Sequence, residues 1–124
     1  MGNPVCLRFD HMSHERAMID TVKHQFYKDL QGSCLAYELL STQVTNDAKT
    51  HSARLPADAA NLAIFDIAFA QFNLGHDYHS AAILCQDAQK RIDTAAQNGF
   101  NVRNLQKEEN KLKSQLPPLH VTGG

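Results

Sequence analysis

Apolar residues recur at helical spacing along most of this chain, with polar residues in the positions between them. The spacing predicts five helical segments. These segments cover approximately residues 14–30, 34–47, 57–74, 77–98 and 102–115. Beyond residue 12, no run of β-branched and aromatic residues alternates with polar ones, so the sequence predicts an all-α protein.

The two central segments carry the strongest pattern. Residues 57–74 are apolar on most sides, as expected for a helix that several neighbours contact. Residues 77–98 repeat small and apolar side chains at three- and four-residue spacing, between a predicted cap at Asp77 and a predicted end at Gly99. Gly75 separates the two segments, so we expect them to form the central hairpin of an antiparallel bundle of four or five helices.

The first half of the chain allows two topologies. Gly32 and Ser33 offer a turn and a new N-cap, which favours two helices, whereas the apolar positions keep their phase across them, which favours one helix. We favour the break, because one helix over residues 14–47 would be about 50 Å long, roughly twice the length of the next helix. The apolar stripe predicted after the break contains Leu35, Leu39, Leu40 and Val44.

The loop-forming residues between 45 and 56 predict the internal connection of the fold. With 124 residues, the chain is expected to form a single helical domain over residues 1–124, with loose termini at residues 1–12 and 117–124. The charges of its 12 basic and 13 acidic side chains nearly cancel, so the net charge indicates no class of binding partner.

Four features of the sequence bear on the location of the protein. The longest apolar stretch is too short and too polar for a membrane span, and the first residues lack the apolar run of a secretory signal, so we expect a cytoplasmic protein. The three cysteines are far apart and form no CxxC pair, which predicts neither a disulfide framework nor a cysteine zinc site. A myristoylation signal has Gly2 and a Ser or Thr at position six, whereas this chain has Gly2 and Cys6. Whether Gly2 or Cys6 carries a lipid therefore stays open.

A short motif, Leu74-Gly75-x-x-Tyr78, joins the central segments and is followed by Ala81 and Ala88. In these residues the chain resembles a single tetratricopeptide-type helical hairpin over residues 61–95. The resemblance implies a scaffold that binds peptides or proteins, rather than an enzyme. Ala88 lies one place beyond the family's usual small residue, and no second copy follows at a period of about 34 residues. The alternative is a short turn in an ordinary helical bundle.

The sequence contains no glycine-rich phosphate loop and no nucleophile motif, and Cys34 and Cys85 lie on apolar helix faces. We therefore predict a non-catalytic protein-interaction module without a cofactor. Its candidate contact residues are Phe65, Phe69, Phe72 and Tyr78. If some large apolar residues of this helix, including Leu62 and Leu74, stay uncovered, they would form the contact of a homodimer.

Two alternative functions rest on other residues. Histidines at three-residue spacing share a helix face, so each of two pairs offers two imidazoles to one metal ion. The pairs are His11 with His14 and His76 with His79. They fall at the same end of the bundle only if residues 14–47 form one helix.

The second alternative is a small regulator that contacts nucleic acid. Arg103, Lys107 and Lys111 follow one face of the last helix at four-residue spacing. A solvated helix face explains them more simply, because a nucleic-acid surface needs more positive charge and aromatic residues for stacking.

Asp66 is the unusual polar residue of the apolar helix over 57–74. It shares a face with Asn73 on a helical wheel, so we expect it on a narrow side exposed to solvent. If it were buried, it would need a partner and its pKa would be perturbed.

Overall fold

The computed structural model describes residues 15–116, and the predicted loose termini lie outside these residues. Helices make up nearly all of this range. They are α1 (Glu15–Lys28), α2 (Leu30–Thr50), the short 3₁₀ helix η2 (Ser52–Arg54), α3 (Leu55–Asn73), α4 (Tyr78–Gln97) and α5 (Arg103–Gln115). Residues 15–116 contain no strand, so the prediction of an all-α fold is confirmed.

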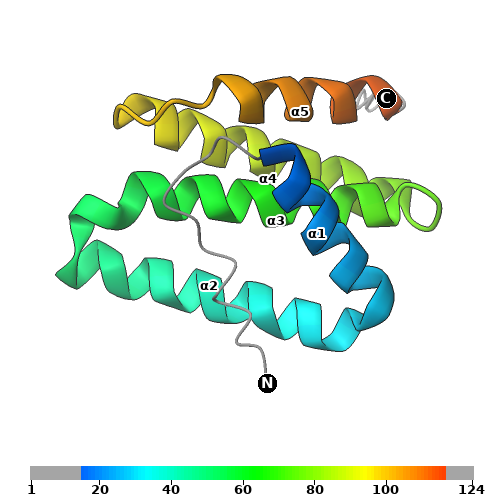
Figure 1. Ribbon diagram of the computed structural model, residues 1–124, viewed down its shortest axis with the longest axis horizontal. Helices are drawn as coiled ribbons and strands as arrows, with labels where there is room; N and C mark the ends of the chain where they lie inside the picture. The colour runs from blue at the N-terminus through cyan, green and yellow to red at the C-terminus, as the bar shows by residue number, and fades with distance from the viewer. Residues whose placement is uncertain (1–14, 117–124) are drawn as a thin grey trace.

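The third helix, α3, lies in the middle of the bundle (Figure 1). Its neighbours α2 and α4 both run antiparallel to it, α5 lies along α4, and α1 crosses α3 obliquely (Figure 1). Nearly every residue of α3 between 58 and 70 is buried, as predicted for a helix with several neighbours. The predicted bundle around the α3–α4 hairpin is therefore confirmed.

The chain turns between α1 and α2 at Asp29. The Oδ1 atom of Asp29 accepts a hydrogen bond of 2.9 Å from the backbone N–H of Gly32, which caps the N-terminus of α2. A methyl group on Gly32 would collide with the Asp29 carboxylate, so the glycine leaves room for the cap. The predicted break is thus present, but it lies three residues before Gly32, which belongs to the first turn of α2.

The end of α2 differs from the prediction of a loop over residues 45–56. The helix continues to Thr50, and η2 is the connection to α3. Asp47, in the last turn of α2, is buried, and its carboxylate lies 3.8 Å from His51 and 3.9 Å from Arg54. These contacts favour the helix in a segment whose loop-forming residues favour a turn.

The buried face of α2 also differs from the predicted stripe. Leu40 is only 3% exposed, whereas Leu35 and Leu39 are 55% and 44% exposed. Ser33 and Ala36 are buried instead, because small side chains let α2 approach its neighbours closely. Two members of the predicted stripe, Leu35 and Leu39, therefore lie outside the core.

Predicted signals mark both ends of α4. Asp77 caps its start, where Oδ1 accepts a hydrogen bond of 3.1 Å from the backbone N–H of Ser80. Gly99 follows its end with φ of +87°, and the N–H of the next residue, Phe100, donates a hydrogen bond of 3.0 Å to the carbonyl of Ala95.

Between residues 15 and 116, none of the helices has the length and apolarity needed to cross a membrane.

Candidate functional site

A chain of polar contacts links three helices across the middle of the bundle. The Tyr37 hydroxyl of α2 donates a hydrogen bond of 2.5 Å to Oδ1 of Asp66 in α3. The Asp66 carboxyl also interacts with the Asp87 carboxyl of α4, and a hydrogen bond between the two requires that one of them be protonated. Asp87 also accepts a hydrogen bond of 3.4 Å from Nε of Arg91, one helical turn further along α4. We call these four residues the acid cluster.

The two carboxyl groups of the acid cluster have opposite protonation preferences. Burial, followed by the hydrogen bond to Asp87, raises the pKa of Asp66 to about 9. The hydrogen bond from Asp66 instead lowers the pKa of Asp87, with the charge of Arg91 acting in the same direction. Asp66 is therefore the protonated partner near neutral pH, and it donates its proton to an ionised Asp87.

The prediction that Asp66 faces solvent is wrong. Its side chain is fully buried, because α2 and α4 both pack on α3 and bring Tyr37 and Asp87 to it. The expectation for a buried Asp66, a partner and a perturbed pKa, describes what is found. The partners come from other helices, so no wheel drawn on α3 alone reveals them.

Aromatic rings in contact run from the core to the surface at the end of the bundle where α1 and α3 finish. Phe26 stacks on Phe69 with ring centroids 4.3 Å apart. Phe72 contacts Tyr27 at 4.8 Å, edge to face, and His76 at 5.1 Å, stacked. Tyr27 exposes 60% of its surface, so the series of contacts ends in solvent.

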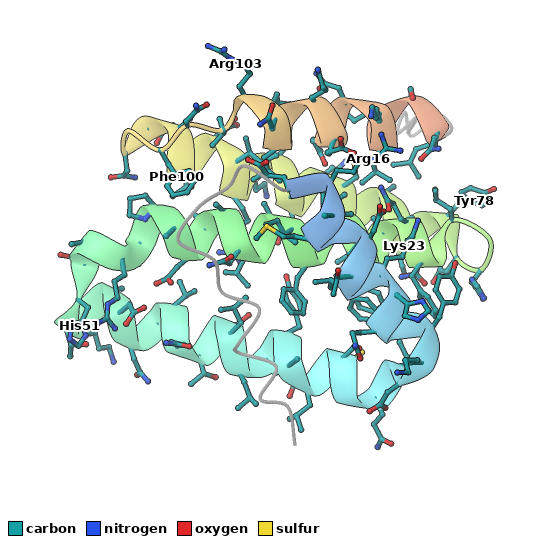
Figure 2. The ribbon with its side chains drawn as sticks, in the orientation of Figure 1. Arg16, Lys23, His51, Tyr78, Phe100 and Arg103 are labelled. Carbon is teal, nitrogen blue, oxygen red and sulfur yellow. The ribbon has the colours of Figure 1, made fainter. Side chains whose placement is uncertain are left out.

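Tyr78 is the first residue of α4 and follows His76 by two positions in the chain. It is 53% exposed and projects from the α3–α4 turn away from the bundle (Figure 2). We call Tyr27, Phe72, His76 and Tyr78 the aromatic end.

The candidate contact residues therefore lie in different surroundings. Phe65 is buried and stacks on Tyr37 with ring centroids 6.0 Å apart, so it offers no surface to a partner. Phe69 and Phe72 are half-buried. Leu62 is buried and Leu74 is half-buried, so the uncovered contact surface predicted along this helix is largely absent. The cause is that α1, α2 and α4 all pack on α3.

The four candidate metal ligands are not all within the described residues. His76 and His79 are exposed near the α3–α4 turn, whereas His11 and His14 lie outside residues 15–116. Within residues 15–116, no group of three or more His, Cys, Asp or Glu side chains is placed to hold a metal ion. The metal hypothesis stays a prediction.

The candidate basic residues Arg103, Lys107 and Lys111 are all exposed on α5, and Arg103 points away from the bundle (Figure 2). Lys107 and Arg16 of α1 line a pocket of about 470 Å³ between the two helices. Three carboxylates line it as well, and they belong to Glu15, Asp20 and Glu108. Both signs of charge therefore meet here, and a nucleic-acid contact stays a prediction.

Sequence reasoning missed four polar residues with buried or shared roles. Asp87 and Arg91 are spaced as a helical ion pair, which the sequence shows. Glu109 lies between Leu105 and Leu112 on the apolar face of α5, at four- and three-residue spacing, which the sequence also shows. Tyr37 carries no such signal, because its partner is 29 positions away.

The chain matches no protein-family model, no curated protein and no solved structure. The likeness of residues 61–95 to a tetratricopeptide-type hairpin therefore stays a resemblance, and the function has to be argued from the geometry.

Proposed function

We propose that this protein is a non-catalytic interaction module that binds a partner protein through the aromatic end. The observation that carries the proposal is the exposure of two tyrosines, Tyr27 at 60%, which packs on Phe72, and Tyr78 at 53%, at the start of α4. Tyrosine is enriched among the residues that contribute most to protein–protein binding. A large ring gives much contact area for the loss of few side-chain rotations.

The packing of the aromatic end favours tight binding. Tyr27 rests against Phe72, which itself contacts Phe26 at 5.9 Å and Phe69 at 6.2 Å. A side chain that is already held loses less conformational entropy when a partner covers it. The same surface offers the hydroxyl of each tyrosine at its rim for polar contacts.

The acid cluster does not require a catalytic role. Burial and the neighbouring Asp87 raise the pKa of Asp66, whereas the hydrogen bond from Tyr37 and the charge of Arg91 act in the opposite direction. Perturbed carboxyls occur in structural networks as well as in active sites. The proposed function therefore assigns the acid cluster to the bundle itself.

A photo-crosslinking residue in place of Tyr78 tests the proposal in cells that express the protein. Gln97, exposed at the opposite end of α4, is the matched control position. We expect one dominant adduct from position 78 and none from position 97. An adduct with twice the mass of the chain would identify a second copy as the partner.

Binding of the captured protein, once purified, gives the quantitative test. Tyr27→Ala and Tyr78→Ala are each expected to raise its Kd about fivefold or more, because contact aromatics commonly cost over 1 kcal/mol when truncated. Leu39→Ala, an exposed apolar residue on α2, is expected to leave the Kd unchanged. Equal crosslinking from both positions, or a Kd that neither tyrosine changes, would overturn the proposal.

A further inference from the structure

The last helix carries an acid in the middle of the face that holds it to the bundle. Leu105 and Leu112 of α5 are both fully buried. Glu109 lies on the same face between them and is fully buried as well. α5 is the outermost helix beside α4 (Figure 1). An ionisable group therefore occupies a position where an apolar residue would stabilise docking most.

Glu109 has incomplete hydrogen bonding when it is ionised. Its Oε2 atom accepts a hydrogen bond of 3.2 Å from the Cys85 thiol of α4. Its Oε1 atom is buried and has no hydrogen-bond partner among the described residues. Lys113, one turn along α5, donates to Oε1 of Gln89 at 2.7 Å rather than to Glu109. A buried carboxylate in this setting costs free energy, whereas the neutral acid costs much less.

The charged groups around Glu109 do not compensate for its burial. From α4, Cys85 stays a thiol, because burial raises its pKa to about 12. From α5, Lys113 is the cation that acts on Glu109. The buried acids of α1 and α3 are Glu15, Asp58 and Asp66, and none of them contributes to the pKa shift of Glu109. Burial raises the pKa of Glu109 to about 7, although the hydrogen bond from Cys85 and the charge of Lys113 both act in the opposite direction.

We propose that α5 docks reversibly on the bundle under the control of Glu109: the helix is held while this carboxyl is protonated and is released when it loses its proton to water. The released helix exposes Glu109 to solvent and uncovers the Cys85 thiol beneath it. This inference rests on the buried position of Glu109 between α5 and the bundle, on its Oε1 atom without a hydrogen-bond partner and on the outermost position of α5. It does not depend on the function proposed for the aromatic end.

The direction of the pH dependence follows from the two states. The pKa of Glu109 in the docked state, about 7, lies above its value of 4.5 in an exposed state. The stability that the neutral acid gives to docking is therefore fully present below pH 4.5 and is lost as the pH rises to about 7. The equilibrium constant for opening is expected to rise about 40-fold between pH 5 and pH 7, and to level off above this range.

Modification of Cys85 by a methanethiosulfonate reagent measures this opening in the full chain with Cys6→Ser and Cys34→Ser. Dividing each rate by that of the denatured chain at the same pH removes the ionisation of the thiol itself. We expect the resulting protection of Cys85 to fall about 40-fold between pH 5 and pH 7. In Glu109→Gln, which cannot ionise, the protection is expected to change much less. A fall of the same size in both chains, or no fall in either, would overturn the proposal.

Hydrogen exchange of the unsubstituted chain gives a second measurement that does not depend on the variant folding. If α5 opens by itself, its amides are less protected than those of α3, and their exchange depends less steeply on the urea concentration, because this opening exposes less surface than global unfolding. Equal protection of α5 and α3 at every pH would show that α5 opens only with the whole bundle, and the proposal would be wrong.

Discussion

Tyr37 donates a hydrogen bond of 2.5 Å to Asp66, which joins a half-buried residue of α2 to a fully buried acid of α3. Because Asp66 also shares a hydrogen bond with Asp87, one carboxyl group connects three helices. A shift of α2 along α3 would leave this buried carboxyl without the hydroxyl. The contact therefore favours one register of α2, a helix whose apolar face is only weakly defined by its sequence.

Tyr37→Phe is expected to lower the free energy of unfolding by about 1–3 kcal/mol, because Oδ1 of Asp66 stays buried without its donor. Urea denaturation measures the change. Tyr27→Phe is the matched control, since this tyrosine is exposed, and we expect a change within about 0.5 kcal/mol. Similar losses in the two variants would contradict the role assigned to the Tyr37 hydroxyl.

The pKa of Asp66 predicts a loss of stability at alkaline pH. Its folded-state pKa of about 9 lies above the unfolded value of 3.8, so the stability that it contributes is present below pH 3.8 and is lost as the pH rises through about 9. Glu109 contributes only a small further change above about pH 7, because its folded-state titration is nearly complete there. Between pH 7 and pH 9, the unsubstituted chain should therefore lose stability, whereas Asp66→Asn should lose much less. Parallel curves for the two proteins would show that Asp66 is already ionised at pH 7.

The helices could be predicted from the sequence because their signals are local. Asp77 and Gly99 act on neighbouring backbone groups, and both mark the ends of α4 as expected. The segment 45–50 was misjudged because the helix there is supported by Asp47, His51 and Arg54, through contacts that act against local propensity. Helix propensity alone predicts such a segment poorly, because contacts at the end of the helix determine its conformation.

The candidate site was harder to predict than the fold, because it depends on which helices meet. The aromatic pattern of α3 identified Phe72 but could not show that α1 would place Tyr27 against it. In the same way, the wheel of α3 placed Asp66 on an open side that α2 and α4 cover. Both errors arise from relationships between helices rather than within one.

The buried face of α2 gives a sharp test, because two adjacent leucines differ in their surroundings. Leu40→Ala is expected to cost about 2–5 kcal/mol of unfolding free energy, as for other buried leucines. Leu39→Ala is expected to change it by no more than about 0.5 kcal/mol, since Leu39 is exposed. Urea denaturation measures both. If the two variants lose similar stability, α2 does not bury Leu40 in preference to Leu39.

The turn at Asp29 predicts that two substitutions are coupled. Asp29→Ala removes the cap of α2 and is expected to cost about 0.5–2 kcal/mol, whereas Asp29→Asn keeps an acceptor and should cost less. Gly32→Ala improves helix propensity by about 1 kcal/mol but displaces the Asp29 carboxylate, so its net effect in the natural chain is small. In the Asp29→Ala background the collision is gone, and Gly32→Ala should stabilise the protein by about 1 kcal/mol. The four urea midpoints form a double-mutant cycle, and an effect of Gly32→Ala that is equal in both backgrounds would show that Gly32 does not serve the cap.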